Sequence, residues 1–149
     1  MKQTLPQNSG ARKAKQIVET YCAADGRPVQ FLITTRKFPS GFLLEAEETP
    51  DSRGTRFGYR FSAFSTINPW RALGPLRDKI RRNLAIKYLD TSEPFALPTH
   101  DELVGRIDYS SEDEEVVLEI DGRKVTKDEF WRIVSTYEGF EIELKLHSG

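Results

Sequence analysis

Residues 120–146, IDGRKVTKDEFWRIVSTYEGFEIELKL, contain the local signals that decide the fold of this chain. Asp121-Gly122 is a two-residue hairpin signal, because both residue types tolerate the positive φ that a type I′ turn requires. It predicts a turn between a strand over residues 115–120 and a short returning strand over 123–125. A further strand is predicted over 103–109, joined to the next by an acidic turn at 110–114.

A helix is predicted to begin after this hairpin. Thr126 and Glu129 have the spacing of a capping box, in which each side chain satisfies a backbone N–H group at the helix start. The helix is expected to end near Tyr137, with Gly139 as the left-handed residue beyond it and Phe140 folding back on Val134. The residues expected to be buried are Phe130, Ile133, Val134 and Tyr137.

The last residues of the stretch alternate between apolar and polar side chains. The apolar positions are Phe140, Ile142, Leu144 and Leu146, and the polar positions between them are Glu141, Glu143, Lys145 and His147. A period of two is typical of a strand that lies with one face on a core. We therefore predict a final strand with a polar outer face.

Upstream, residues 29–65 are expected to form a three-stranded antiparallel meander. Strands are predicted over 29–36 and 42–47 around a turn, and Phe57, Tyr59, Phe61 and Ala63 alternate with polar residues in the third strand. The intervening segment 49–55 is predicted to be a loop. A short helix is predicted over residues 12–24, where apolar residues share one helical face.

Between the two halves, the main helix is predicted over residues 75–89. Asn68 and Pro69 favour one preceding helical turn at 69–73, and Gly74-Pro75 is expected to interrupt the helix, because Pro75 has no N–H group. The apolar stripe of the main helix consists of Leu76, Ile80, Leu84 and Tyr88.

These elements define an α+β fold with antiparallel sheet. The order is β-meander, helix, β-hairpin, helix and β-strand, with the helices packed on one face. We expect a flexible N-terminus over residues 1–11 and one domain over 12–149. Two subdomains, 12–89 and 101–149 joined by the irregular segment 90–100, are the alternative.

Length and composition exclude several classes. The 149 residues carry a formal net charge of −1, so no global charge attracts nucleic acid or a membrane. The single cysteine, Cys22, excludes an intrachain disulfide and fits a reducing compartment. The N-terminus lacks the apolar region of a secretory signal, and no apolar run approaches the roughly 20 residues that span a bilayer. A cytoplasmic location is expected.

The same C-terminal stretch resembles a family of uncharacterised bacterial proteins. The signature is an Asp-Gly-Arg turn at 121–123, a Glu-Phe pair within a helix at 129–130, and Tyr-Glu-Gly-Phe at 137–140 leading into a strand. Weaker similarity reaches residues 26–29, before which relatives often carry Cys-x-x-Cys. Here Asp25 stands at the second cysteine position, so a zinc knuckle of relatives would be lost or altered. The resemblance implies a shared fold and transfers no function.

Two segments raise the question of catalysis. Cys22 as a nucleophile would need a base such as His100 or His147, and we interpret it instead as a small, half-buried apolar residue. His100, Asp101 and Glu102 are adjacent, so their side chains do not converge by sequence alone; a solvated loop is the favoured interpretation. No catalytic residue is predicted.

Metal and cofactor motifs give no stronger signal. The acidic run Glu112-Asp113-Glu114-Glu115 lacks the alternating ligands and the glycine of a calcium loop, and we interpret it as a solvated hairpin tip. Cys22 with Asp25 lacks the paired spacing of a zinc site. No cofactor and no metal site are predicted.

The main helix is the strongly basic segment of the sequence. Residues 70–89 contain six basic residues and one acidic residue. The predicted contact surface for an anionic partner consists of Arg77, Lys79, Arg81, Arg82 and Lys87, and Arg56 and Arg60 lie on a neighbouring strand. Such a face neutralises phosphates, although basic residues also serve simply to solvate an amphipathic helix.

Taken together, the sequence favours a non-catalytic protein-binding or regulatory module. The alternatives are a nucleic-acid-binding protein that uses the helix 75–89 and a small enzyme with dispersed active-site residues. An unidentified protein is the expected partner, and a homodimer formed through a sheet edge is a further hypothesis.

Overall fold

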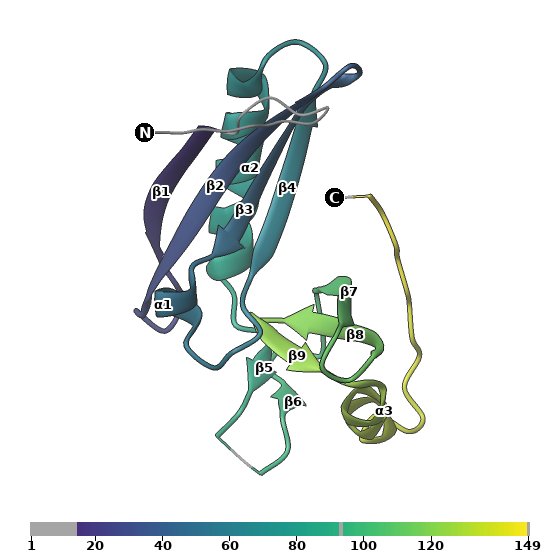
Figure 1. Cartoon of the computed structure of the whole chain (residues 1–149). Helices are drawn as coiled ribbons and strands as arrows, with labels where there is room; N and C mark the ends of the chain where they lie inside the picture. Colours follow the sequence, from purple (N-terminus) through teal and green to yellow (C-terminus); the bar gives the residue numbers. More distant parts are fainter. Residues whose placement is uncertain (1–14, 93, 149) are drawn as a thin grey trace.

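The structure is a computed structural model that describes residues 15–92 and 94–148. The predicted flexible N-terminus, residues 1–11, lies outside the described residues. The chain forms an α+β structure with antiparallel sheets, as the sequence predicts (Figure 1). Its described part divides into two units that each have a buried core, which we call the N-terminal unit and the C-terminal unit.

The N-terminal unit is a four-stranded sheet, here called the large sheet, with one helix on one face (Figure 1). Its strands, paired in chain order, are β1 (Lys15–Cys22), β2 (Pro28–Phe38), β3 (Gly41–Glu48) and β4 (Arg60–Ser65). The predicted loop 49–55 contains the one-turn helix α1 (Pro50–Arg53), which Thr49 caps by accepting from the Ser52 N–H. Alternate residues of β2, such as Phe31 and Ile33, are buried under the helix α2 (Pro69–Leu84).

The predicted helix over residues 12–24 is wrong in its described part. Residues 15–22 form β1, which pairs with β2 along its full length, from Lys15 opposite Thr35 to Cys22 opposite Pro28. Tyr21 turns toward the core and packs edge-on against Phe31. The open edge of β2 therefore decides the conformation, because a paired strand satisfies backbone groups that a short amphipathic helix would leave to solvent.

The predicted interruption at Gly74-Pro75 is also wrong, since α2 runs through Pro75 without a break. A proline inside a helix removes one N–H bond. Gly74 and Pro75 are exposed on the outer side of the helix. The inner side stays continuous and buries Ala72, Leu73, Leu76, Ile80 and Leu84 on the large sheet. Asn68 caps the helix by accepting from the Arg71 N–H, as expected.

The C-terminal unit begins where α2 ends. A short pair, β5 (Leu89–Asp90) and β6 (Leu97–Pro98), lies in the predicted irregular connection. The small sheet consists of β7 (Arg106–Ser110), β8 (Glu115–Ile120) and β9 (Arg123–Val125), and α3 (Lys127–Ser135) packs on it. Tyr88, predicted on the helix stripe, belongs to this second core together with Ile120, Val125 and Ile133. The two helices therefore cover two different sheets.

The predicted hairpin and capping box are confirmed. Asp121 and Gly122 both have positive φ, 55° and 75°, and they connect β8 to β9 as predicted. The Thr126 side chain accepts from the Glu129 N–H while the Glu129 side chain accepts from the Thr126 N–H. Gly139 has a φ of 93°, but Phe140 is exposed and packs edge-on against Tyr137 rather than on Val134.

The predicted final strand is not formed within the chain. Residues 140–146, here called the C-terminal segment, belong to no sheet in the described structure. The segment leaves α3 and runs past the small sheet without joining it (Figure 1). Its alternating pattern favours an extended backbone, but a pattern does not supply a partner strand.

The Asp121-Gly122 turn also connects the two units. The Asp121 carboxylate accepts from the N–H groups of Tyr88 and Leu89 at 3.1 and 2.8 Å. The Gly122 carbonyl accepts from the Gly58 N–H at 2.8 Å. A Cβ atom on Gly122 would lie 2.9 Å from the Tyr59 ring, so only glycine allows this approach.

We predict that Thr126→Ala lowers the free energy of unfolding by about 1 kcal/mol, because it leaves N–H groups at the start of α3 without an acceptor. Thr126→Ser is the control, since a serine hydroxyl retains the cap. Thermal or urea unfolding measures both. Equal stability of the alanine variant and the wild type would contradict the role of the cap.

We predict that Asp121→Ala lowers the free energy of unfolding by about 2 kcal/mol, because the N–H groups of the buried residues Tyr88 and Leu89 lose their half-buried acceptor. Asp121→Asn should cost less, since asparagine tolerates positive φ and keeps one acceptor oxygen. Urea unfolding of the two variants side by side provides the measurement. The idea fails if the alanine variant is no less stable than the asparagine variant.

Candidate functional site

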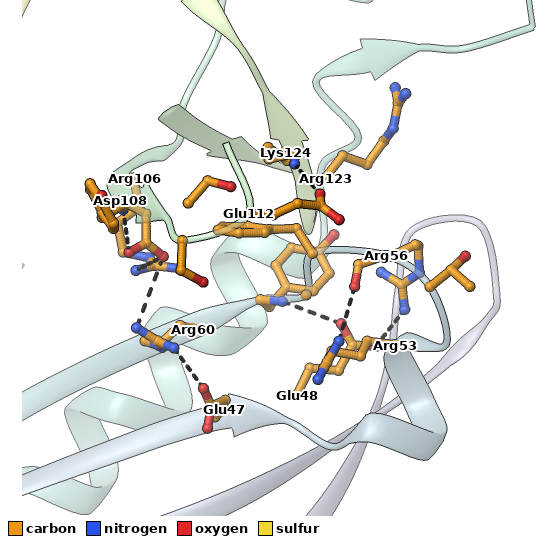
Figure 2. Close-up of a pocket in the computed structure, with 17 residues that line it drawn as sticks. Glu47, Glu48, Arg53, Arg56, Arg60, Arg106, Asp108, Glu112, Arg123 and Lys124 are labelled. Atoms are coloured by element: carbon orange, nitrogen blue, oxygen red, sulfur yellow. Dashed lines mark hydrogen bonds and ion pairs between the residues drawn. The ribbon is translucent and has the colours of Figure 1, made fainter. Parts of the chain in front are cut away.

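A cavity in the described structure lies between the two units. It has a volume of about 620 Å³, within the range of small-molecule sites. Its lining is rich in charge, with six basic side chains from both units (Arg53, Arg56, Arg60, Arg106, Arg123 and Lys124) and four acidic ones (Glu47, Glu48, Asp108 and Glu112). Figure 2 shows charged side chains of the two units on opposite sides of the cavity, with the Arg123 side chain extending away from it.

A buried carboxylate, Glu48, organises the N-terminal wall of the cavity. Glu48 is the last residue of β3 and its side chain has no exposed surface. It accepts from the Arg56 guanidinium at 2.5 Å, from the Ser52 hydroxyl at 2.7 Å and from the Tyr59 N–H at 3.3 Å. A buried charge is tolerated only with such partners, so Glu48 fixes Arg56 in place.

Further ion pairs connect the N-terminal wall to the wall formed by the C-terminal unit. Arg60 of β4 lies 2.7 Å from Glu47 and 3.9 Å from Asp108 of β7, so this pair spans the two units (Figure 2). Arg106 lies 2.8 Å from Asp108 and 3.8 Å from Glu119. Four of the six basic residues are thus paired with carboxylates of the same chain, counting Lys124, which contacts Glu112 and Asp113. Most charges of the cavity are thus paired within one unit, and the Arg60–Asp108 pair joins the two units.

Among the carboxyl groups near this cavity, Glu119 has the largest shift in pKa. It lies on β8 with its side chain 5% exposed. Burial raises the pKa of Glu119 from its ordinary 4.5 to about 7, and this rise exceeds the opposing effects of the Gly122 N–H bond and of Arg106. Its hydrogen bond from the Gly122 N–H is 2.7 Å long. Glu119 therefore acts on the connecting turn, and its charge depends on pH near neutrality.

The predicted anionic-partner surface on α2 is partly occupied by contacts inside the chain. Arg77 forms a two-pronged ion pair with Glu19 of β1, and this contact lowers the pKa of Glu19. Lys79 donates to the Ser62 carbonyl at 2.6 Å, and burial lowers its pKa. Arg81 pairs with Asp78 at 3.1 Å.

The remaining members of that predicted surface, Arg82 and Lys87, are exposed. Neither forms an ion pair with any described residue. Of the five predicted residues, only Arg82 and Lys87 therefore have a side chain with neither an ion pair nor a hydrogen bond to the described part of the chain.

The other segments considered in the sequence do not converge either. Cys22 is exposed at the end of β1, so its interpretation as a half-buried apolar residue is wrong; alternation along β1 directs it away from the core. His100 and Glu102 are exposed, and Asp101 accepts from the Tyr137 hydroxyl at 2.7 Å. Among residues 15–92 and 94–148, no three His, Cys, Asp or Glu side chains gather as a metal-ion site.

The acidic run forms the turn between β7 and β8, as expected. Asp113 accepts from Lys124 and from the Ser110 hydroxyl, and the Lys124 contact lowers the pKa of Asp113. The run is thus tied to β9 rather than freely solvated along its whole length. Its role is to close the hairpin beside the charged cavity.

A second candidate site is the C-terminal segment. Its apolar side chains Phe140, Ile142, Leu144 and Leu146 are 69–76% exposed. The uncovered end of the small sheet carries three more exposed apolar side chains on one face, Ile107, Tyr109 and Val116. Sequence alternation identified the strand character of the segment, but it could not show that its apolar face stays exposed.

Comparison with known families divides the chain at the end of α2. Residues 18–85 match the model of a Domain of unknown function (DUF7686), and residues 88–148 match that of a second Domain of unknown function (DUF7713). No curated protein and no solved structure matches the chain. The chain is thus similar to two uncharacterised domain families, which agrees in general terms with the expected resemblance. The second match includes the whole C-terminal segment.

No helix of the described residues is long and apolar enough to cross a membrane.

We predict that the pH dependence of stability between pH 6 and pH 8 arises largely from Glu119. A carboxyl with a raised pKa binds more protons in the folded state than in the unfolded state. Its contribution to stability is complete below 4.5 and is lost as the pH rises through about 7. The wild type should therefore melt at a lower temperature at pH 8 than at pH 6.

Glu119→Gln should flatten this dependence and raise the melting temperature at pH 8 by several degrees, because the amide carries no charge and can still accept from Gly122. Glu138→Gln, at an exposed position, is the matched control and should behave as wild type. Differential scanning calorimetry at both pH values provides the comparison. An unchanged pH dependence in Glu119→Gln would show that other groups are responsible.

Proposed function

We propose that this chain is a non-catalytic protein-binding module of the bacterial cytoplasm, and that the C-terminal segment is its docking element. The observation that carries the proposal is the exposure of four alternating apolar side chains, each at least 69% exposed, on an extended segment outside every sheet. A binding role accounts for both the alternation and the exposure.

The chemistry of the segment fits strand addition. An extended segment contributes main-chain N–H and C=O groups to an open sheet edge, and alternate side chains fill apolar pockets. Burial of each large apolar side chain stabilises a complex by roughly 1.5–3 kcal/mol before the costs of association. The segment lies within residues 88–148, which match a domain family, so it belongs to the sequence that defines that family.

The alternatives have less support. An enzyme would need reactive groups that converge on an accessible cavity, whereas the charged groups of the large cavity are mostly paired with one another. The predicted basic helix 75–89 ends at Leu84 as α2, and Lys87 lies beyond it. Nucleic-acid binding at this surface would rest on Arg82 and Lys87, since Arg77, Lys79 and Arg81 are engaged within the chain. The exposed thiol of Cys22 suits a reducing compartment.

We predict that Ile142→Glu combined with Leu144→Glu abolishes the capture of the partner from lysate, because charges on the apolar face prevent its burial. Glu141→Gln combined with Glu143→Gln changes the opposite face of the same segment and serves as the matched control. Affinity capture followed by mass spectrometry compares the three proteins. A partner should be retained by the wild type and the control only.

Two results would contradict the proposal. One is a partner retained equally by the Ile142→Glu/Leu144→Glu variant. The other is salt-sensitive retention of DNA or RNA that is lost on replacing Arg81 and Arg82 with Glu, which would favour the nucleic-acid alternative. Neither Ile142 and Leu144 nor Arg81 and Arg82 lie in a core. The two double variants should therefore unfold near the wild-type temperature.

A further inference from the structure

The C-terminal unit exposes an acceptor edge as well as a donor strand. β7 and β9 are the edges of the small sheet. β9 has three residues, whereas β7 has five and presents Ile107 and Tyr109, both 58% exposed, on one face. In the large sheet, the neighbouring exposed residues Ile17 and Val18 of β1 point to opposite faces, and Phe64 is the single exposed large apolar residue of β4. Among the described edges, β7 matches an apolar strand best.

We propose that the C-terminal segment of one copy adds as a strand to the edge of β7 in a second copy of this chain, and that the exchange is reciprocal. This inference rests on the proposed function and names its partner. The resulting small sheet has four strands, and Leu144 and Leu146 become cross-strand neighbours of Ile107 and Tyr109. Reciprocal exchange of an identical element produces a closed dimer with two-fold symmetry.

Charge selects the alignment of the two strands. The polar face of β7 carries Arg106 and Asp108, and the polar face of the segment carries Glu141, Glu143 and Lys145. A parallel alignment with Ile107 beside Leu144 places Arg106 beside Glu143 and Asp108 beside Lys145. Both pairs are then of opposite charge, which stabilises neighbouring strands.

The antiparallel alignments that keep the apolar faces together are less favourable. With Ile107 opposite Leu144, Arg106 faces Lys145 and Asp108 faces Glu143. Shifting the segment so that Ile107 faces Ile142 places Asp108 opposite Glu141 and Arg106 opposite Glu143, which is one like pair and one opposite pair. Shifting it the other way, so that Ile107 faces Leu146, keeps one opposite pair, Asp108 with Lys145, and places Arg106 opposite His147. Pairs of opposite charge stabilise neighbouring strands, so we propose the parallel alignment, which has two of them.

A second copy is the partner that satisfies both open features at once. In each chain the donor segment lies off the small sheet while the acceptor edge is unpaired (Figure 1). Because the two features complement each other in polarity pattern and charge, every chain carries both halves of one interface. Long exposed apolar edges are otherwise a liability for a protein.

The test mixes two single-cysteine chains, each in a Cys22→Ser background. One carries Ile107→Cys and the other Leu144→Cys, so a disulfide between them can form only between copies. We expect a covalent dimer after mild oxidation, since neighbouring strands bring Cα atoms within the range of a disulfide. Val116→Cys replaces Ile107→Cys in the matched control, because Val116 is equally exposed on the same face of β8 but is two strands away from the added strand.

A second pair of mixtures tests the direction of the strand. Tyr109→Cys should crosslink with Leu146→Cys in the parallel alignment, whereas crosslinking with Ile142→Cys instead would overturn that alignment. Light scattering on the unmodified chain should give twice the monomer mass, and Ile142→Glu/Leu144→Glu should reduce it to the monomer mass.

A monomeric wild type over micromolar to submillimolar concentrations would overturn the dimer, as would equal crosslinking of the Val116 control. The lysate capture would still test the proposed function after such results, because it detects a partner protein other than a second copy of this chain. Failure of the dimer and failure of the binding module are therefore separate outcomes.

Discussion

The Asp121-Gly122 turn holds the two units of the molecule against each other. Its side chain, its N–H group and its carbonyl contact three separate places: the chain after α2, Glu119 on β8, and Gly58 before β4. Positive φ at both residues makes this geometry accessible, and the missing side chain of Gly122 admits the Tyr59 ring. The position of the Arg60–Asp108 ion pair, which joins the units, depends on this contact.

The charged cavity illustrates how the same residue types serve structure or binding according to their partners. In the sequence, Arg56 and Arg60 are polar positions beside an alternating strand, which predicts that they are exposed. In the structure, each lies against a carboxylate of this chain. The buried carboxyl groups of Glu48 and Glu119 are stabilised by the donors around them. Paired charges of this kind contribute register between units more than net stability.

The C-terminal segment has the opposite character, because its strand pattern is complete while its pairing is absent. Apolar side chains at this exposure are unfavourable in water. The apolar face of β7 beside α3 is also open. The C-terminal unit therefore contains a strand-like segment and a strand edge that both lack a partner, and each has exposed apolar side chains at every second residue. The proposed binding through the segment and the proposed dimerisation through β7 both rest on these two features.

The sequence by itself determined the elements whose interactions lie within a few residues. The hairpin at Asp121-Gly122, the Thr126 capping box and the strands on either side of the turn are local, and their bounds were predictable. Only the tertiary structure decided that residues 15–22 are a strand, since β2 supplies the partner, and that α2 continues through Pro75, since the buried stripe lies on the other side. It also decided which candidate site residues have a hydrogen-bond or ion-pair partner inside the chain. Arg77 and Glu19 are 58 residues apart in the chain, and a contact across such a separation depends on how the chain folds back, which local pattern does not encode.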